Sequence, residues 1–372
     1  MSHRTRSQRS ALTALKAVVV GLAALFAGSA NGADTIRQYQ LAPGASGYEL
    51  QLKEVPRPTA QPHQVLVRVH AVSLNRRDLM MLNGRYGPGG AAGNGVPLSD
   101  GAGEVIAVGA DVTRFKIGDR VAGIFFERWL DGEPSAEVLG TARGGNAGGM
   151  LSEVIVTDPA GLVKIPDHLS FEEAATLPCA GVTAWVALFK RGGLKAGEFV
   201  LLEGTGGVSV LGLQLAAAAG AKPIITSSSD QKLARAKELG AFGTVNYRAN
   251  PEWQREVRAL TGGVGVDHVL EVGGQDTLPK ALEALAYGGH IALIGGLSGF
   301  ASDVPVGALM GLGASVTGIY VGSRADFEAM NAFISEHRIR PVVDRVFSLD
   351  EAPAAFEYMN SGDFLSKIVI RL

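Results

Sequence analysis

The sequence predicts a two-domain α/β protein, in which a parallel sheet with helices on both faces is joined to a smaller β-rich part. Three observations predict it. Between residues 34 and 157, short apolar runs are separated by Gly, Pro and Asp. From about residue 171, strand-like and helix-like segments alternate, which is typical of a doubly wound sheet. The length of 372 residues agrees with two domains.

Two segments of the first part carry clear strand patterns. Residues 65–69 (VLVRV) alternate apolar and polar side chains, and residues 104–108 form another short apolar run. Residues 125–149 are rich in Gly, Glu and Ala and predict a long excursion loop. Short strands bounded by turn residues favour a small barrel or sandwich.

The second part begins with a predicted helix over residues 171–190, kinked at Pro178. The expected strands that follow are 199–202, 223–226, 269–272 and 291–294, with helices over 208–220, 230–239 and 278–287. After Gly318 we expect a helix over residues 325–336 and short strands that end at 367–372. This alternation predicts the parallel sheet.

Composition excludes several classes of protein. The net charge of −2 gives no basic excess for nucleic acid binding. The 50 glycines are about twice the usual share and have no G-X-Y period, so they indicate tight turns and close backbone approaches, not collagen. One cysteine excludes an internal disulfide and any multi-cysteine zinc site.

Residues 1–33 resemble a secretory signal. Basic side chains precede an apolar run over residues 17–27, and small residues follow, so cleavage after Ala30 or Ala33 is expected. The run is shorter than the ~20 residues of a transmembrane helix, and we expect no stable membrane insertion of the mature chain. The alternatives are a membrane-skimming helix or an over-extended start. The expected location is periplasmic or exported if residues 1–33 are a signal, and cytoplasmic is the alternative.

A glycine-rich turn follows the first expected strand of the parallel sheet. The segment from residue 199 onward reads FVLLEGTGGVSVLGLQLA, so Gly204, Gly206 and Gly207 lie between a buried strand and a helix that begins at Val208. This context suits the pyrophosphate of a dinucleotide, which binds helix N–H groups. Ser209 stands where the third glycine of G-x-G-x-x-G would fall. The alternative is an ordinary strand–helix turn.

The end of the next strand indicates which cofactor binds. An acid that binds the ribose is expected there in NAD enzymes, but this chain has Ser227 and Ser228, with no carboxylate before Asp230. Serine hydroxyls and Lys232 would bind a 2′-phosphate, so NADP(H) is favoured over NAD(H). Asp230 is alternatively the N-cap of the following helix, and Lys232 a solvated helix residue.

Local motifs resemble the medium-chain dehydrogenase/reductase superfamily, in its zinc-independent alcohol dehydrogenase-like and quinone oxidoreductase-like branch. The similarity covers residues 36–372. The segments that carry it are residues 72–88 (VSLNRRDLMMLNGRYGP), 97–109, 117–121, 177–185 and the glycine turn with 227–241. The resemblance implies a GroES-like β-barrel catalytic domain at 34–165 and 319–372, a Rossmann cofactor domain at 166–318, and a homodimer formed through the edge of the cofactor domain.

The departures from the zinc enzymes of this superfamily are informative. The first zinc ligand is replaced by Asn75, the His-Glu pair by Ser99 and Asp100, and only Cys179 is retained. Residues 123–149, which would hold four structural cysteines, contain none. Because a catalytic zinc needs about three protein ligands, we expect no metal. Cys179 is then a small buried apolar residue or, alternatively, a reactive thiol.

The resemblance also implies further cofactor residues. Thr183 and the pair Gly295 and Gly296 are expected beside the nicotinamide and its ribose. Tyr247 is expected near the adenosine 2′-phosphate, and Arg324 near a phosphate or the nicotinamide amide. Each has a structural alternative: a turn for the glycines, an edge of the core for Tyr247, and a surface charge at a helix start for Arg324.

Asn75 and Tyr86 are the expected substrate-pocket residues, because an amide and a phenol can hydrogen-bond a substrate oxygen as charge develops there. Asp78 is a possible orienting acid. Arg76 and Arg77 are expected to be surface or structural residues. Aromatic side chains that would line the pocket, or alternatively pack the loop, are Phe125, Phe126 and Trp129.

Three functions follow as hypotheses. The first is a zinc-free, NADPH-dependent oxidoreductase that transfers hydride to a small quinone or activated carbonyl or alkene substrate. The second is a zinc-independent alcohol dehydrogenase. The third, of another class, is a catalytically silent NADPH-binding protein.

Overall fold

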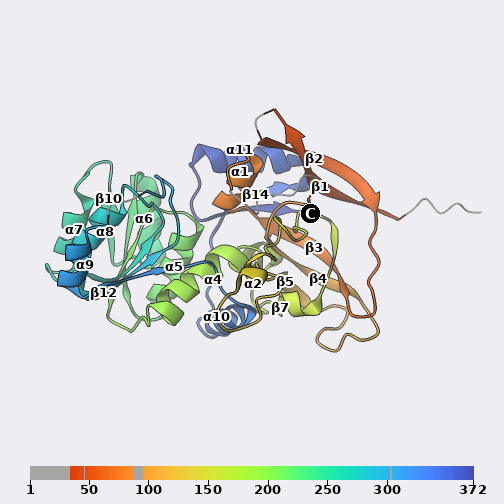
Figure 1. Cartoon of the computed structure of the whole chain (residues 1–372), viewed down its shortest axis with the longest axis horizontal. Coiled ribbons are helices and arrows are strands. Elements are labelled where there is room, and N and C mark those ends of the chain that lie inside the picture. Colours follow the sequence, from red (N-terminus) through yellow and green to blue (C-terminus); the bar gives the residue numbers. More distant parts are fainter. Residues whose placement is uncertain (1–33, 46, 87–94, 302–303) are drawn as a thin grey trace, which may run out of the picture. The chain divides into compact units, whose positions relative to one another are not determined.

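The computed structural model describes residues 34–45, 47–86, 95–301 and 304–372 (Figure 1). The chain divides into two units, Met1–Thr35 and Ile36–Leu372, and the architecture below concerns the second. The predicted signal in residues 1–33 lies outside the described residues. Among the described residues, no helix combines the length and apolar character needed to cross a bilayer.

A six-stranded parallel sheet forms the second half of the fold. Its order is β10-β9-β8-β11-β12-β13, and every neighbouring pair is parallel. The strands are β8 (Phe199–Leu202), β9 (Lys222–Ser227), β10 (Gly243–Asn246), β11 (Val266–Glu271), β12 (Leu285–Leu293) and β13 (Ser315–Gly318). The order reverses between β8 and β11, and in such sheets ligands bind outside the carboxyl ends of the strands at this point.

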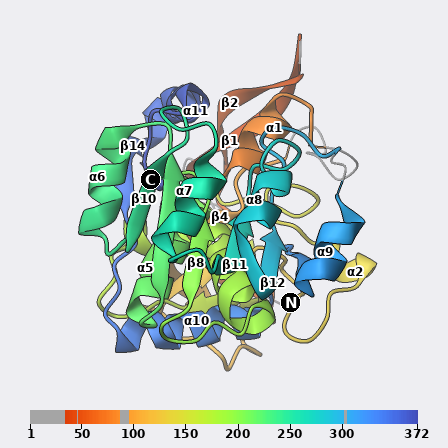
Figure 2. The same cartoon turned by 90° about the vertical axis from the view of Figure 1, so that its left-hand side faces the viewer.

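Helices cover both faces of this sheet (Figure 2). They are α5 (Gly207–Ala218), α6 (Asp230–Glu238), α7 (Trp253–Leu260), α8 (Leu278–Ala284) and α9 (Val306–Leu312). Alternate residues of β8 enter different cores: Val200 and Leu202 pack with α5, and Leu201 packs with α7 and α8. The predicted doubly wound parallel sheet is confirmed.

One predicted helix is too long. The pattern predicts a helix over 278–287, but α8 ends at Ala284 and β12 begins at Leu285. Leu285 is extended, fully buried, and paired with Val266 of β11. Burial in the sheet therefore outweighs the local helical preference of these residues.

The N-terminal part and the C-terminus share a seven-stranded sheet. Its order is β14-β15-β3-β4-β5-β7, and β6 pairs with β3. These strands are β3 (Val65–Ser73), β4 (Asp100–Val108), β5 (Arg120–Gly123), β6 (Val154–Thr157), β7 (Leu162–Lys164), β14 (Val343–Ser348) and β15 (Lys367–Arg371). A separate pair is formed by β1 (Thr35–Gly44) and β2 (Gly47–Pro56). The domain boundaries at residues 165 and 318 stay a prediction.

Short helices accompany this sheet. They are α1 (Arg76–Leu82), α2 (Ala136–Leu139), the 3₁₀ turns η1 (Pro159–Gly161) and η4 (Leu349–Glu351), and α11 (Ala352–Ser361). Within the sheet, β15 runs antiparallel to β3, with Ile370 opposite Val72. The last strand of the chain therefore lies beside the segment that leads into α1.

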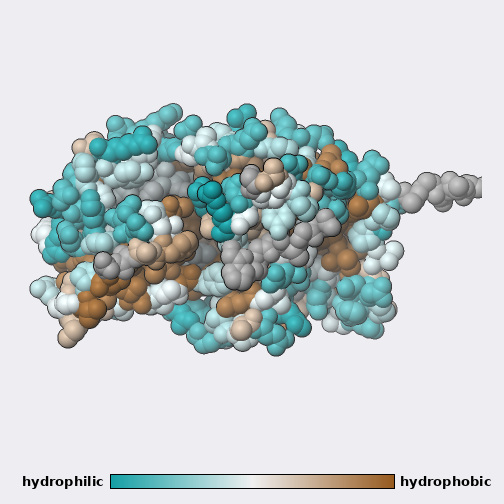
Figure 3. Space-filling model, turned by 45° about the horizontal axis from the view of Figure 1, so that its top comes forward, coloured by the Kyte–Doolittle hydropathy of each residue, from teal (hydrophilic) through white to brown (hydrophobic). Residues whose placement is uncertain are grey.

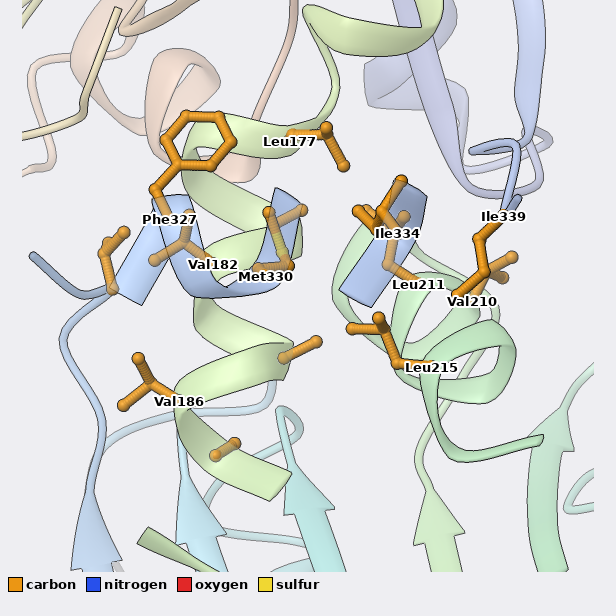
Figure 4. Close-up of a cluster of buried hydrophobic side chains, with 14 of the residues drawn as sticks. Leu177, Val182, Val186, Val210, Leu211, Leu215, Phe327, Met330, Ile334 and Ile339 are labelled. Atoms are coloured by element: carbon orange, nitrogen blue, oxygen red, sulfur yellow. The ribbon is translucent and has the colours of Figure 1, made fainter. Parts of the chain in front are cut away.

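The helical run over residues 171–191 contains α3 (Phe171–Ala174), η2 (Leu177–Gly181), α4 (Val182–Trp185) and η3 (Val186–Arg191). Both η segments are π-helical, and Pro178 lies in the first turn of η2, where its missing N–H is tolerated. This run packs against α5 and α10 (Arg324–Glu336). Figure 4 shows the apolar side chains at this contact, among them Leu177, Val182, Leu211, Phe327 and Met330.

Candidate active site

The glycine turn joins β8 to α5 at the reversal of strand order. Gly204 has a φ of +69°, a conformation that favours glycine, and Gly206 is the N-cap of α5. A Cβ at Gly204 or Gly206 would meet no atom within 4 Å, so packing does not demand glycine there. Open space beside N–H groups at a helix start suits the close approach of a phosphate.

Gly207 and Val208 open α5 on the side of the C-terminal strand. A Cβ on Gly207 would lie 2.5 Å from Cδ of Lys367, so the glycine makes room for that side chain. The backbone N–H of Ser366 donates to the Thr205 carbonyl at 2.9 Å. The strand β15 therefore lies directly against the dinucleotide-type turn.

The predicted residues of the second strand gather beside the same turn. The Gly204 N–H donates to Thr226 Oγ1 at 3.1 Å, and the hydroxyls of Thr205 and Ser227 are 3.4 Å apart. Tyr247 donates its backbone N–H to the Ser227 carbonyl at 3.1 Å and keeps an exposed ring. Ser227 and Tyr247 thus lie at one edge of the sheet, next to the turn.

Other details of α6 differ from the expectation. Its N-cap is Ser229, whose hydroxyl accepts from the Lys232 N–H, so the alternative reading of Asp230 as N-cap is wrong. Ser228 is half-buried before this cap. The Lys232 ammonium donates to the Gly362 carbonyl at 2.8 Å, which ties α6 to the end of α11. Its role toward a 2′-phosphate stays a prediction.

The remaining predicted cofactor residues lie in three places. Thr183 is buried in α4. A Cβ on Gly295 would lie 2.8 Å from the Val272 carbonyl oxygen, so this glycine and Gly296 allow the loops after β11 and β12 to approach closely. Arg324 donates to the carbonyl of Ala160 in η1 at 3.1 Å. Their cofactor roles stay predictions.

Two buried carboxyl groups that the sequence reasoning missed lie at the reversal point. Glu203 directly follows β8 and accepts from the N–H groups of Val272 and Gly273, while Glu271 is the last residue of β11 and accepts from the Gly274 N–H. One oxygen of each carboxyl is buried without a donor. Burial and the neighbouring Glu271 raise the pKa of Glu203 well above its usual value, which favours its protonated form. The sequence feature that could have indicated this pair is a glutamate at the carboxyl end of each of two apolar strand segments.

On the barrel side, Asn75 is the N-cap of α1 and forms a capping box with Asp78. The Asn75 N–H donates to Asp78 Oδ2 at 2.7 Å. Asp78 is buried, and burial raises its pKa to about 6 despite the nearby Arg77. The predicted orienting acid therefore acts on the backbone of Asn75.

Lys367, which the sequence reasoning also missed, is the central cation of this region. It is 2% exposed, and its ammonium donates to the Leu74 carbonyl and to Asn75 Oδ1, each at 2.6 Å. An ammonium has donors only, so the Asn75 atom that faces it is the oxygen. Asn75 Nδ2 is buried and has no hydrogen-bond partner. The amide donor is thereby left free.

The residues at the former zinc-ligand positions lie around this lysine. Asp100 Oδ2 is 3.9 Å from the Lys367 ammonium and accepts from the Cys179 N–H at 3.1 Å. Asp100 Oδ1 accepts from the Ser99 hydroxyl at 2.7 Å. Burial and the Asp100 charge raise the pKa of the Cys179 thiol, so it stays protonated.

This donor set does not fit a catalytic zinc. A zinc site requires thiolate, neutral imidazole or free carboxylate ligands, whereas here the thiol is protonated and an ammonium occupies Asn75 Oδ1. Within the described ranges, no group of three or more His, Cys, Asp and Glu side chains could hold a metal ion.

Tyr86 and Arg77 lie beside this cluster. The Arg77 guanidinium carbon is 4.9 Å from the centre of the Tyr86 ring and 4.6 Å from that of Phe125. Burial raises the pKa of the Tyr86 phenol, so it stays protonated. Arg77 is buried and donates to the Arg143 carbonyl, which agrees with the structural one of its two expected roles, whereas Arg76 is exposed. Phe125 covers one face of the guanidinium.

Comparisons with known proteins agree with this architecture. Residues 61–167 match the model of the alcohol dehydrogenase GroES-like domain, and residues 207–336 match that of zinc-binding dehydrogenases. A zinc-type alcohol dehydrogenase-like protein of Schizosaccharomyces pombe is 44% identical over 337 residues, covering 88% of this chain and 96% of that protein. A quinone oxidoreductase-like protein 2 of Bos taurus is 32% identical over 339 residues, covering 87% and 89%. The crystal structure of a putative alcohol dehydrogenase from Sinorhizobium meliloti has a TM-score of 0.86 and 41% identity, covering 91% of this chain and 99% of that one.

The fold and the turn define an oxidoreductase with a GroES-like catalytic domain and a Rossmann cofactor domain, as predicted. The chain belongs to the medium-chain dehydrogenase/reductase superfamily, and it is an enzyme of the alcohol dehydrogenase and quinone reductase type.

Proposed function

We propose that the protein is a metal-free, NADPH-dependent reductase of quinones or of activated carbonyl and alkene compounds. One observation carries this proposal: Lys367 binds the oxygen of the Asn75 amide and leaves its Nδ2–H₂ group without a partner. A fixed, dry hydrogen-bond donor is what a substrate oxygen needs when negative charge develops on it.

The reduced nicotinamide, when bound, supplies the hydride. The chain's own residues then stabilise the product oxygen. Asn75 Nδ2 donates to it, and the Tyr86 hydroxyl donates a second hydrogen bond. Because burial raises the pKa of the Tyr86 phenol, it keeps its proton and acts as a hydrogen-bond donor, and the product oxygen takes its proton from solvent. Lys367 and Asp78 hold Asn75 by its side chain and its backbone respectively.

The residues at the glycine turn fit a dinucleotide. Gly204 and Gly206 leave open space at the start of α5, and the absence of a side chain at Gly207 leaves room for the Lys367 side chain. We propose NADP(H) over NAD(H), because Ser227 and Ser228 stand where a ribose-binding acid is expected. Substituting Ser228→Asp should lower the affinity for NADPH and raise that for NADH, since a carboxylate repels a 2′-phosphate. Equal effects on the two affinities, measured by fluorescence titration, would refute the preference.

The metal-free part of the proposal rests on the donor set. No step is assigned to zinc, because Asn75, Ser99, Asp100 and a protonated Cys179 do not form a zinc site. Dialysis against a chelator should leave the turnover rate unchanged. Stoichiometric zinc in the purified protein, with loss of activity on its removal, would contradict this.

The decisive assay follows absorbance at 340 nm. NADPH with 1,4-benzoquinone should be oxidised, whereas NADP⁺ with a panel of alcohols should give little reduction. The opposite result would favour a zinc-independent alcohol dehydrogenase. Tight NADPH binding without turnover would favour a silent cofactor-binding protein.

We further propose a homodimer formed through β13. This edge strand is largely exposed, and apolar side chains nearby are exposed as well, including Phe300 at 82% and Met310 at 78%. Figure 3 shows hydrophobic surface on the part of the molecule that carries α9 and β12. Unpaired edges and apolar patches are typical of association sites. Met310→Glu should shift the mass measured by light scattering to that of a monomer.

Export through residues 1–33 also stays a proposal. The mass of the mature protein tests it, because cleavage after Ala30 or Ala33 removes the predicted signal. An intact N-terminus would favour the cytoplasmic alternative.

A further inference from the structure

Arg77 is a buried cation whose pKa is raised, despite burial, by the charge of the neighbouring Asp78, but within the described residues it forms no close ion pair with a carboxylate. Its residue is 7% exposed, yet no carboxylate of the described residues forms an ion pair with it within 4 Å. Asp78, the next residue, accepts from the Asn75 N–H instead. Burying a guanidinium is costly when no carboxylate binds its N–H groups directly, because those donors lose their hydrogen bonds to water.

The guanidinium nitrogens of Arg77 that have no hydrogen-bond partner lie on the same edge of the group. Nη1 donates to the Arg143 carbonyl at 2.9 Å, whereas Nε and Nη2 are buried and have no partner. In a planar guanidinium, the N–H groups of Nε and Nη2 point in parallel from the same edge, which matches the two oxygens of a carboxylate. The rings of Tyr86 and Phe125 lie over the group and fix its plane. Arg77 therefore presents two fixed, parallel donors, Nε–H and Nη2–H, which we call the fork.

The fork belongs to the barrel side of the site. Arg77 is contacted by Tyr86, Phe125 and Arg143, and it follows Asn75 in the first turn of α1. The position favours a group on the substrate over a phosphate of the cofactor.

We propose that Arg77 binds a carboxylate of the substrate, so that the preferred substrates are carbonyl, enone or quinone compounds that carry a carboxylate near the reducible group. This inference rests on the proposed reductase function, because it assigns the substrate class of the same site. Asn75 and Tyr86 act on the oxygen that gains charge, and Arg77 holds the far end of the molecule.

Matched substrates test the proposal. We would measure kcat/KM with NADPH for 4-oxopent-2-enoate and its methyl ester, and for 4-formylbenzoate and its methyl ester. The wild type should prefer each acid by about tenfold to hundredfold, the value of a charged, two-point hydrogen bond. Arg77→Met should abolish the preference, and Arg77→Lys, which keeps the charge without the fork, should keep only part of it. Arg68→Met removes an exposed arginine of β3 and should retain the full preference.

Each other result has a defined meaning. Equal kcat/KM for acid and ester in the wild type, or equal losses in Arg77→Met and Arg68→Met, would overturn the proposal. A weaker NADPH affinity in Arg77→Met with an unchanged acid preference would assign the fork to a cofactor phosphate and also overturn it. If the wild type reduces 1,4-benzoquinone but shows no acid preference, only the carboxylate proposal fails.

If the wild type oxidises NADPH with none of these compounds, the reductase function fails, and calorimetry still tests the fork. Heat from 4-formylbenzoate binding to the enzyme–NADPH complex, absent in Arg77→Met, would support the carboxylate site. No heat with the wild type would overturn it. Circular dichroism would verify that Arg77→Met is folded, and Arg77→Lys serves as the second variant where it is not.

Discussion

The ammonium of Lys367 donates a hydrogen bond of 2.6 Å to Oδ1 of Asn75, which lies 292 residues earlier in the chain. The lysine reaches Asn75 because β15 pairs with β3 and because Gly207 has no side chain in its path. One residue thus contacts the substrate-side amide and the start of the cofactor-side helix. Lys367 is a positioning residue for Asn75.

Replacing Lys367 with Met should lower kcat about tenfold or more, because the freed amide can rotate and present its oxygen to the substrate. It should also destabilise the fold by about 3 kcal/mol, since Asp100 then remains buried without a cation. The kinetic effect should nearly vanish in an Asn75→Ala background if it acts through Asn75. An undiminished effect of Lys367→Met in that background would contradict the positioning role.

Tyr86→Phe should reduce kcat about tenfold or more, because the substrate oxygen loses a donor while the ring over Arg77 stays in place. Since burial raises the pKa of this phenol, the wild-type rate should not fall between pH 7 and 9 through its ionisation. Tyr287→Phe, at an exposed position of β12, is the matched control. A rate unaffected by Tyr86→Phe would exclude the phenol from the site chemistry.

Asp78 should make stability depend on pH in a specific window. Burial raises its folded-state pKa to about 6, above the value of 3.8 for an exposed aspartate. A group with a raised folded pKa contributes stability that is present at low pH and lost as the pH rises through that pKa. The free energy of unfolding of Asp78→Asn relative to wild type should therefore increase between pH 4.5 and 7.5. Urea titrations at both pH values measure it, and a constant difference would refute the shifted pKa.

Much of the fold could be predicted because its signals are local. Strand β8 was predicted with its observed limits, since a buried apolar run ends at a glycine turn there. Asn75, Asp78 and Tyr86 could be proposed as site residues because they share one short motif, and their roles stay predictions. Lys367 and Arg77 could not be assigned in this way. The burial of Lys367 follows from the pairing of β15 with β3, and that of Arg77 from rings and a carbonyl contributed by other segments.

Glu203 and Glu271 provide the last prediction. The two carboxyls close neighbouring strands, and burial with the charge of Glu271 raises the pKa of Glu203. Its stabilising contribution is therefore present below the unfolded pKa and lost as the pH rises through the folded one.

Glu203→Gln should remove the loss of stability at high pH, because the amide is neutral at every pH. The amide can also donate to the unpartnered oxygen of Glu271. The melting temperature should rise relative to wild type, and the gain should increase from pH 6 to pH 9. Glu198→Gln is the matched control just before the same strand: its carboxylate pairs with His268 at 3.0 Å and has a lowered pKa, so its removal should give no gain. A lower melting temperature for Glu203→Gln at both pH values would show that the ionised pair stabilises the sheet, contrary to the raised pKa of Glu203.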